Sequence, residues 1–274
     1  MAFSVNTNAG AFAALQNLNS TSSNLNTVQS RINTGLKVAS AKDNAAVFSI
    51  AQKLRGDVSG LNAVKSSLDR ALSTIDVAVA AGEAVSDLLI EMKEKAVAAK
   101  DAGLDTASRT ALNDEFTQLR AQITSIVSNA EFNGTNAVDG SSSIVAITND
   151  DGSNTISIPA QDLALSGTTV TVSSATAIDT AANASAAVDL IEASIGNVNT
   201  SLSSLGAGAK RLELQKDFVG KLSDTIEVGI GNLVDADLAK ESASLQALQV
   251  KQQLGLQALS IANQAPSTVL GLFR

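Results

Sequence analysis

The stretch LNAVKSSLDRALSTIDVAVA, residues 61–80, decides the fold of this chain. Its apolar residues recur at steps of three and four, which is the spacing of a coiled-coil seam, and the pattern continues to Met92. We expect Gly103 to end this helix, because glycine readily adopts the left-handed backbone that follows a helix C-terminus. The seam residues are Leu61, Leu68, Leu72, Ile75, Val79 and Leu89.

Two further blocks repeat this spacing, one after an expected N-cap at Asp105 or Thr106 and one toward the C-terminus. Long helices with only seven Phe and no Trp or Tyr favour a bundle over a globule. The predicted fold class is mainly α: an elongated antiparallel coiled-coil or helix-bundle hairpin with a small β element at the distal tip. The blocks carry Leu112, Phe116, Leu119, Ile123 and Ile126, then Val188, Ile191, Ile195, Val198, Leu202, Leu205, Leu212, Val219, Leu222 and Ile226.

The middle of the chain has a residue pattern that differs from that of the helical blocks. Short alternating runs rich in β-branched residues, such as SSSIVAIT (141–148) and TVTVSS (169–174), predict strands within residues 140–175. The intervening NDDGSN predicts a turn rather than a calcium loop, because the EF-hand register would place isoleucine at ligand positions. Pro159 should end one strand, and Pro266 should break the last helix near its end.

Both ends of the chain are amphipathic but almost free of charge. Arg31 is the first charged residue, and nothing between Lys251 and Arg274 is charged. A polar but uncharged helix face suits contact with protein rather than with bulk water. We expect these arms to become ordered on assembly, through the apolar residues Leu15, Leu18, Leu25, Val28, Ile32, Leu238, Leu245, Leu248, Leu256 and Leu259.

The negative charge is concentrated in one stretch. Residues 121–209 contain eight acidic residues and no Lys or Arg, whereas the rest of the chain has 19 acids and 19 bases. This distribution predicts a neutral assembly core and an acidic outer surface.

Composition also excludes classes of function. Without His or Cys the chain lacks an imidazole base, a thiolate and soft metal ligands, so we expect no enzyme, no cofactor and no metal. The net charge of −8 argues against a nucleic-acid partner. No signal peptide and no membrane-spanning apolar run are visible.

Three motifs resemble the bacterial flagellins. They are RINTGLKVASAKDNAAVFSIAQKLRG at residues 31–56, FNG at 132–134, and the tail beginning ESASLQALQV at residue 241, which contains ANQ and ends in Leu-Phe-Arg; NLVDADLAKES at 232–242 fits the same family. The resemblance covers about the first 140 and the last 90 residues. It indicates a short flagellin that lacks large outer domains.

This resemblance implies an architecture and a set of partners. Arms 1–36 and 235–274 would line the filament core, segments 37–140 and 176–234 would form the surrounding tube, and residues 141–175 would form the outer tip. The partners would be further copies of the chain, with or without paralogous flagellins, an export chaperone and the type III export apparatus, and the filament cap and hook-filament junction proteins. The subunit would be exported without a cleaved signal peptide into the extracellular filament that drives swimming.

Two alternatives remain open at this stage. A hook-filament junction protein has similar ends, and a secreted adhesin could carry its binding tip on a helical stalk. The Ser/Thr-rich middle, with fifteen such residues between 141 and 180, has β-strand and turn chemistry as its simpler explanation. Its functional explanation is surface O-glycosylation, with candidates Ser141, Ser142, Ser143, Thr168, Thr169, Thr171, Ser173 and Ser174.

Overall fold

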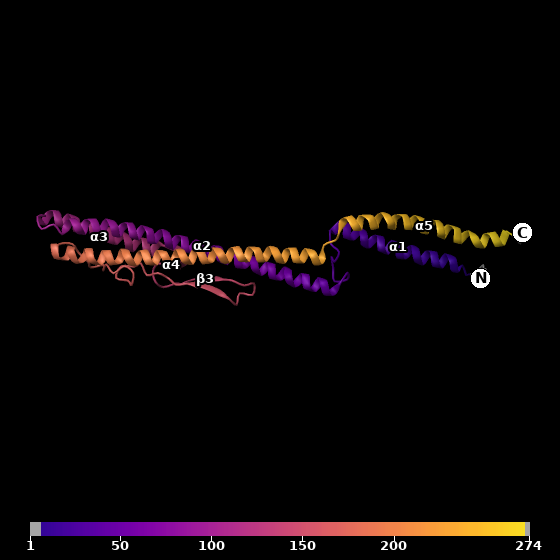
Figure 1. Cartoon of the computed structure of the whole chain (residues 1–274), viewed down its shortest axis with the longest axis horizontal. Helices are drawn as coiled ribbons and strands as arrows, with labels where there is room; N and C mark the ends of the chain where they lie inside the picture. Colours follow the sequence, from indigo (N-terminus) through magenta and orange to yellow (C-terminus); the bar gives the residue numbers. More distant parts are fainter. Residues whose placement is uncertain (1–6, 272–274) are drawn as a thin grey trace. The chain divides into compact units, whose positions relative to one another are not determined.

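A computed structural model describes the backbone of residues 7–271 and the side chains of residues 7–264. The chain is mainly α, about 72% helical, with a small β component, as predicted (Figure 1). It divides into two compact units, an arm unit of Met1–Gly56 with Thr225–Arg274 and a bundle unit of Asp57–Asp224. The elements are α1 (Ala9–Thr34), α2 (Ala45–Ala99), α3 (Thr106–Asn129), β1 (Glu131–Phe132), β2 (Thr135–Asn136), β3 (Ile144–Ile147), β4 (Thr155–Ile158), α4 (Ala181–Val234) and α5 (Leu238–Gly271).

The seam of α2 is buried in the bundle unit at alternating steps of three and four. From Leu61 to Ala99 these positions are shielded from solvent, whereas Leu72 and Val79, which we also placed in the seam, are half-buried. α3 contributes Phe116, Ile123 and Val127 to the same core. α4 contributes the apolar residues Ala184, Ala187, Ile191, Val198, Leu205, Leu212 and Val219.

Ion pairs set the register of these helices. Lys93 contacts Glu192 at 2.7 Å and Asp69 contacts Lys216 at 2.5 Å, so α2 and α4 run antiparallel. Lys95 of α2 contacts Glu115 of α3 at 2.6 Å. All three pairs are partly exposed, so they align the helices more than they stabilise them.

The turn between α2 and α3 is held by side chains at both ends. Asp105 is the N-cap of α3, as predicted, and its carboxylate accepts a hydrogen bond from the Ser108 amide at 2.7 Å. α2 ends at Ala99, four residues before Gly103. The Arg109 side chain donates to the Ala99 and Asp101 carbonyls at 3.0 and 2.8 Å, which satisfies acceptors that the helix end leaves open.

The β component is a pair of short hairpins. β1 and β2 are joined by Asn133 and Gly134, both with positive φ (49° and 78°), which is the Asn-Gly turn of a tight hairpin. We did not predict this hairpin, although the Asn-Gly pair signals it. β3 and β4 form the second hairpin with Val145 opposite Ser157, and β4 ends at Ile158 immediately before Pro159, as predicted.

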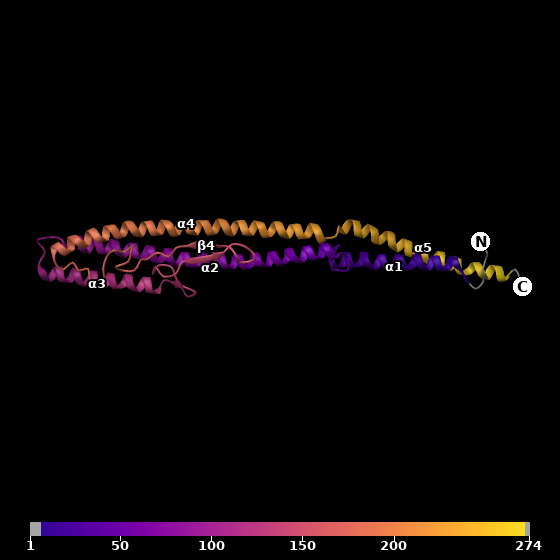
Figure 2. The ribbon, with the colours of Figure 1, turned by 90° about the horizontal axis from the view of Figure 1, so that it is seen from below.

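The predicted small β element is present, and its β3–β4 hairpin lies along α2 and α4 (Figure 2) instead of forming a separate tip. Its turn packs on Gly60 of α2, the Ser67 hydroxyl accepts a hydrogen bond from the Ile147 amide at 3.3 Å, and Ile158 packs on Gly208 of α4. A two-stranded hairpin is not stable alone in water. The buried face of this one, Ile144, Ala146, Ile156 and Ile158, needs the helices as cover.

Two other local expectations differ from the structure. Residues 169–174 form no regular strand; the Thr171 amide instead donates to the Ser194 hydroxyl of α4 at 3.0 Å. α5 continues past Pro266 to Gly271, so that proline does not end the helix. A proline removes one backbone donor and strains the preceding turn, and a long helix can absorb this cost.

Candidate assembly surfaces

In the arm unit, α1 and α5 pair antiparallel along their lengths. At one end the Asn8 side chain donates to the Ala262 carbonyl at 2.6 Å. Midway, Leu18 lies against Gly255, where a Cβ would approach its Cδ1 to 3.3 Å. At the other end Arg31 contacts Glu241. The arms therefore form one two-helix element rather than two separate tails.

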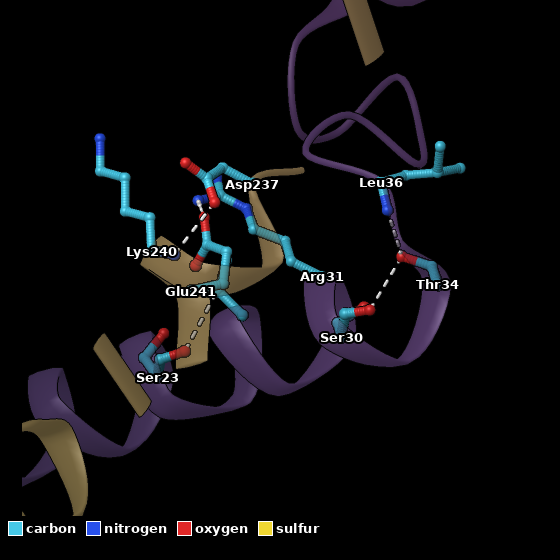
Figure 3. Close-up of polar contacts among 9 residues, drawn as sticks. Ser23, Ser30, Arg31, Thr34, Leu36, Asp237, Lys240 and Glu241 are labelled. Carbon is cyan, nitrogen blue, oxygen red and sulfur yellow. Dashed lines mark hydrogen bonds and ion pairs between the residues drawn. The ribbon is translucent and has the colours of Figure 1, made fainter. Parts of the chain in front are cut away.

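Figure 3 shows the charged end of this element. The Arg31 Nη1 and Glu241 Oε1 atoms lie 3.2 Å apart, and the Glu241 side chain is only 13% exposed. Asp237 caps α5 by accepting hydrogen bonds from the Ala239 and Lys240 amides at 3.0 and 3.1 Å. Asp237 and Glu241 lie at the N-terminus of α5, and Arg31 lies in the last turn of α1. Each of these charges therefore interacts favourably with the dipole of its own helix.

The two connections that flank this end are hydrogen-bonded to each other, and we call residues 35–38 and 234–237 the clasp. The Lys37 amide donates to the Val234 carbonyl at 2.7 Å, and the Ala236 amide donates to the Gly35 carbonyl at 2.9 Å. Gly35 has φ 72°, a left-handed backbone that glycine adopts at no steric cost. The clasp joins segments about two hundred residues apart in sequence, which periodicity alone could not reveal.

A turn after the clasp is closed by Asp43. Its carboxylate accepts hydrogen bonds from the Ala39 and Ser40 amides at 3.1 and 2.9 Å and from the Ser40 hydroxyl at 3.1 Å. Hydrogen bonds from Ser40, with smaller contributions from Ala39 and the nearby Arg31 charge, lower the pKa of this carboxyl below its usual value. Asn44 then caps α2 by accepting from the Val47 amide.

The ten predicted interface residues fall into three groups by exposure. Leu25 and Val28 are buried between the two arms. Leu18, Ile32, Leu245, Leu248 and Leu259 are half-buried, and Leu15, Leu238 and Leu256 are exposed. The pairing of α1 with α5 thus covers part of the predicted set and leaves the rest open.

Further apolar residues of the arms are exposed that the sequence reading did not select. Phe12 is 66% exposed and Ile261 is 70% exposed, and Val250 and Leu254 are also open to solvent. They do not follow the seam that α1 and α5 share. On α5, Val250, Leu254 and Ile261 form a second apolar stripe, and its spacing is the signal that could have found these three.

A groove of about 720 Å³ opens beside the clasp. Its lining includes the apolar residues Val28 and Leu248 together with both bases and acids. The charged lining residues are Arg31, Lys37, Lys240, Lys251, Asp235, Asp237 and Glu241. A mixed lining of this kind suits a protein surface better than a small anion or cation.

The bundle unit has its own exposed apolar residues. On α4, Leu214 and Phe218 are more than half exposed, and Leu222, which we placed in the seam, is also exposed. On α2, Ile90 and Val97 are exposed on the side near Lys93. Leu222 falls outside the buried face because α4 buries Val219 and Ser223 at this level.

The candidate glycosylation residues differ in accessibility. Ser141, Ser143, Thr168 and Ser174 are exposed, whereas Ser142 and Ser173 are half-buried. Thr169 is buried with its hydroxyl 3.5 Å from that of Ser201, and the Thr171 hydroxyl donates to the Leu190 carbonyl at 3.2 Å. Thr169 and Thr171 therefore serve the packing of this segment on α4.

No chemical site is evident in the part of the chain that the structure describes. Residues 7–264 contain no cluster of acidic side chains arranged to hold a metal ion. Asp151 instead closes the hairpin turn by accepting from the Ser153 amide at 3.0 Å. Within the same described range, no helix is both long and apolar enough to cross a bilayer.

Comparison with known proteins agrees with this arrangement of helices. Residues 5–143 match the model of the bacterial flagellin N-terminal helical region, and residues 188–273 match that of the C-terminal helical region. Flagellin FljK of Caulobacter vibrioides is 52% identical over 272 residues, covering 99% of this chain and 98% of the relative. A flagellin of Brucella melitensis is 37% identical, with 99% of each chain covered.

A solved structure shares the fold. A flagellar hook-associated protein from Vibrio parahaemolyticus has a TM-score of 0.57 at 13% identity, and the match covers 70% of this chain and 100% of that one. At this identity the likeness concerns architecture alone. Both ends of the chain match the family and the full-length relatives align across the middle, so this protein belongs to the bacterial flagellins and is a structural subunit of the flagellar filament.

Proposed function

We propose that this flagellin polymerises through its paired arms, with residues 1–36 and 235–274 in the filament core, 37–140 and 176–234 in the surrounding tube, and 141–175 on the outside. The observation that supports this is the incomplete burial of the arms. Pairing α1 with α5 buries Leu25 and Val28 but leaves Phe12, Leu256 and Ile261 exposed. Neighbouring copies would remove this apolar surface from water.

The near absence of charge on the arms supports the same role. Apolar surface exposed on unassembled arms is unfavourable in water. Burying an unpaired charge is also unfavourable, and arms with so few charged residues avoid this when they pack among other copies. Most of the charges that do occur lie near the clasp, where Arg31 and Glu241 neutralise each other. We infer that the clasp fixes the point where the core arms meet the tube.

Assembly outside the cell requires export, and the family supplies the expected route. The subunit passes unfolded through the type III export apparatus without a cleaved signal, a cytoplasmic chaperone covers the C-terminal arm, and a cap at the filament end directs its addition next to hook-filament junction proteins. The chain has no disulfide to reduce before such passage, since its sequence contains no cysteine. The subunit performs no catalysis in this role.

Seeded elongation tests the proposal. Purified chain is added to short filament seeds, and growth is followed by light scattering and electron microscopy. The full chain should elongate the seeds, whereas a variant lacking residues 1–36 and 252–274 should stay monomeric. Normal filaments from the truncated variant would overturn the proposal.

A matched pair of substitutions sharpens this test. Ile261→Ser and Ile90→Ser each remove one exposed isoleucine, from the arm unit and the bundle unit respectively. Only the arm variant should raise the concentration needed for growth. Equal growth of Ile261→Ser and the unchanged chain would count against the core role of the arms.

A further inference from the structure

We infer that an apolar stripe on α4 of one copy docks into a recess beside α2 of the next copy. The two copies would lie side by side without a shift along the axis of the bundle unit. This inference rests on the proposed filament function and names one contact within it. The stripe consists of Leu214, Phe218 and Leu222. The recess is formed by α2, the β1–β2 turn and β3.

The stripe lies on the side of α4 that is turned away from α2. Its three residues follow one another at steps of four, so they lie on one helix face, and they are 59%, 56% and 36% exposed. Lys216 lies on the face of α4 that is turned toward α2, because its ammonium contacts Asp69 of α2 at 2.5 Å. Phe218 is two residues further on, about 200° around the helix.

The recess lies beside α2, the helix that pairs with α4. It has a volume of about 190 Å³ and is lined by Arg70 and Thr74 of α2, by Phe132 of the first hairpin and by Val145 of β3, among others. Arg70 follows Asp69 and so lies about 100° around α2 from the residue that faces α4. Val145 is 53% exposed at its edge.

The recess has the size to accept one side chain of the stripe. A cavity of roughly 150 Å³ accepts a benzene ring, so 190 Å³ accepts the phenyl ring of one Phe. Arginine and aromatic side chains, such as Arg70 and Phe132 in the lining of the recess, are often strongly contributing residues in protein interfaces. Phe218 is the aromatic residue that the stripe presents.

Charges on the two surfaces are complementary. Asp217 lies beside Phe218, and Arg70 lines the recess; within the described side chains neither forms an ion pair, and Arg70 makes only a long hydrogen bond of 3.4 Å to the Ser67 hydroxyl. Docking Phe218 brings Asp217 to the rim where Arg70 lies. A guanidinium and a carboxylate left unpaired in one copy are thereby paired between two.

The positions of the two surfaces along the axis of the bundle unit determine the type of contact. Asp69 and Lys216 form an ion pair, and Arg70 and Phe218 lie one and two residues from them, so recess and stripe lie at the same level of the bundle unit. They face different directions, and β3 of the hairpin forms one wall of the recess. Such a contact joins unlike surfaces, and its repetition gives an open helix or a closed ring, as a tube wall requires.

A pair of serine variants tests the apolar part of the contact. Phe218→Ser and Ile90→Ser start from nearly equal exposure, 56% and 54%, so neither should change the helix content or unfolding temperature of the monomer. Seeded elongation should be about tenfold slower for Phe218→Ser and within about twofold of the unchanged chain for Ile90→Ser. Equal elongation by the two variants would overturn the inference.

A charge exchange tests the pairing of the two surfaces. Arg70→Glu and Asp217→Arg should each slow elongation, whereas the chain carrying both should recover most of the lost rate; Lys100→Glu, an exposed change of the same charge, serves as the control. A double variant no faster than the single ones would contradict the contact. If the unchanged chain fails to elongate seeds, the proposed filament function is contradicted. If Phe218→Ser elongates seeds as fast as the unchanged chain, only the inferred contact is contradicted.

Discussion

Gly60 of α2 lies directly against the backbone of Asp150 at the turn of the β3–β4 hairpin, where a Cβ would sit 2.6 Å from the Asp150 carbonyl oxygen. A contact to backbone cannot be relieved by a change of rotamer. The absence of a side chain at Gly60 therefore lets the hairpin lie along the helix.

Gly60→Ala should destabilise the chain by about 1–3 kcal/mol, because the added methyl group forces the hairpin turn away from α2. Gly56→Ala is the matched control, since it lies in the same helix with no atom within 4 Å of its added Cβ. That control should be neutral or stabilising by up to about 1 kcal/mol, as alanine favours helix over glycine. Denaturant unfolding followed by circular dichroism measures both; equal stabilisation by the two changes would contradict the close packing.

Arg31→Ala should loosen the base of the paired arms. The substitution leaves Glu241, whose side chain is 13% exposed, without its counter-charge, and we expect a loss of about 1 kcal/mol. Lys240→Ala, on the exposed neighbouring position, should have a smaller effect. Protease resistance of the arms and the unfolding temperature report the difference, and indistinguishable variants would show that the ion pair contributes nothing.

Stability should be flat from about pH 5 to 8 and fall in acid. The chain has no His to titrate in the neutral range. Hydrogen bonds from Ser108 lower the pKa of Asp105 below its usual value, and hydrogen bonds from Ser40 do the same for Asp43. A carboxyl whose pKa is lower in the folded chain than in the unfolded chain stabilises the fold above its unfolded pKa, and this contribution is lost as the pH falls through the folded value.

Asp105→Asn isolates one part of this acid dependence. Asparagine also caps helices well but has no charge to lose, so the variant should unfold at nearly the same temperature at pH 7 and lose less between pH 5 and pH 3. Thermal unfolding at a series of pH values supplies the comparison. An unchanged acid profile would assign the acid sensitivity to the other carboxyls.

Glycosylation, where it occurs, should be confined to the accessible hydroxyls Ser141, Ser143, Thr168 and Ser174. Intact mass of filament-derived protein followed by peptide mapping gives the sites. A glycan on Thr169 would contradict the structure, because that side chain is buried against Ser201. A mass equal to that of the sequence would remove the modification altogether.

Periodicity in the sequence was sufficient for the helices and for much of the core. Leu61, Leu68 and Ile75 are buried at the predicted spacing, Asp105 caps α3, and Pro159 follows the last residue of β4. These outcomes depend on residues close together in the chain. Side-chain spacing, helix capping and the lack of a backbone N–H in proline all act between residues that are close in sequence. They can therefore be predicted from the sequence directly.

The tertiary structure decided which residues meet across long separations. It placed the β3–β4 hairpin along the helices because four buried apolar residues of a two-stranded hairpin need cover, and it joined Gly35 to Ala236 in the clasp. It also left Phe218 exposed on a helix whose neighbouring seam is buried. Apolar character by itself fixes only that a side chain avoids water; the partner that covers it depends on the packing of distant segments.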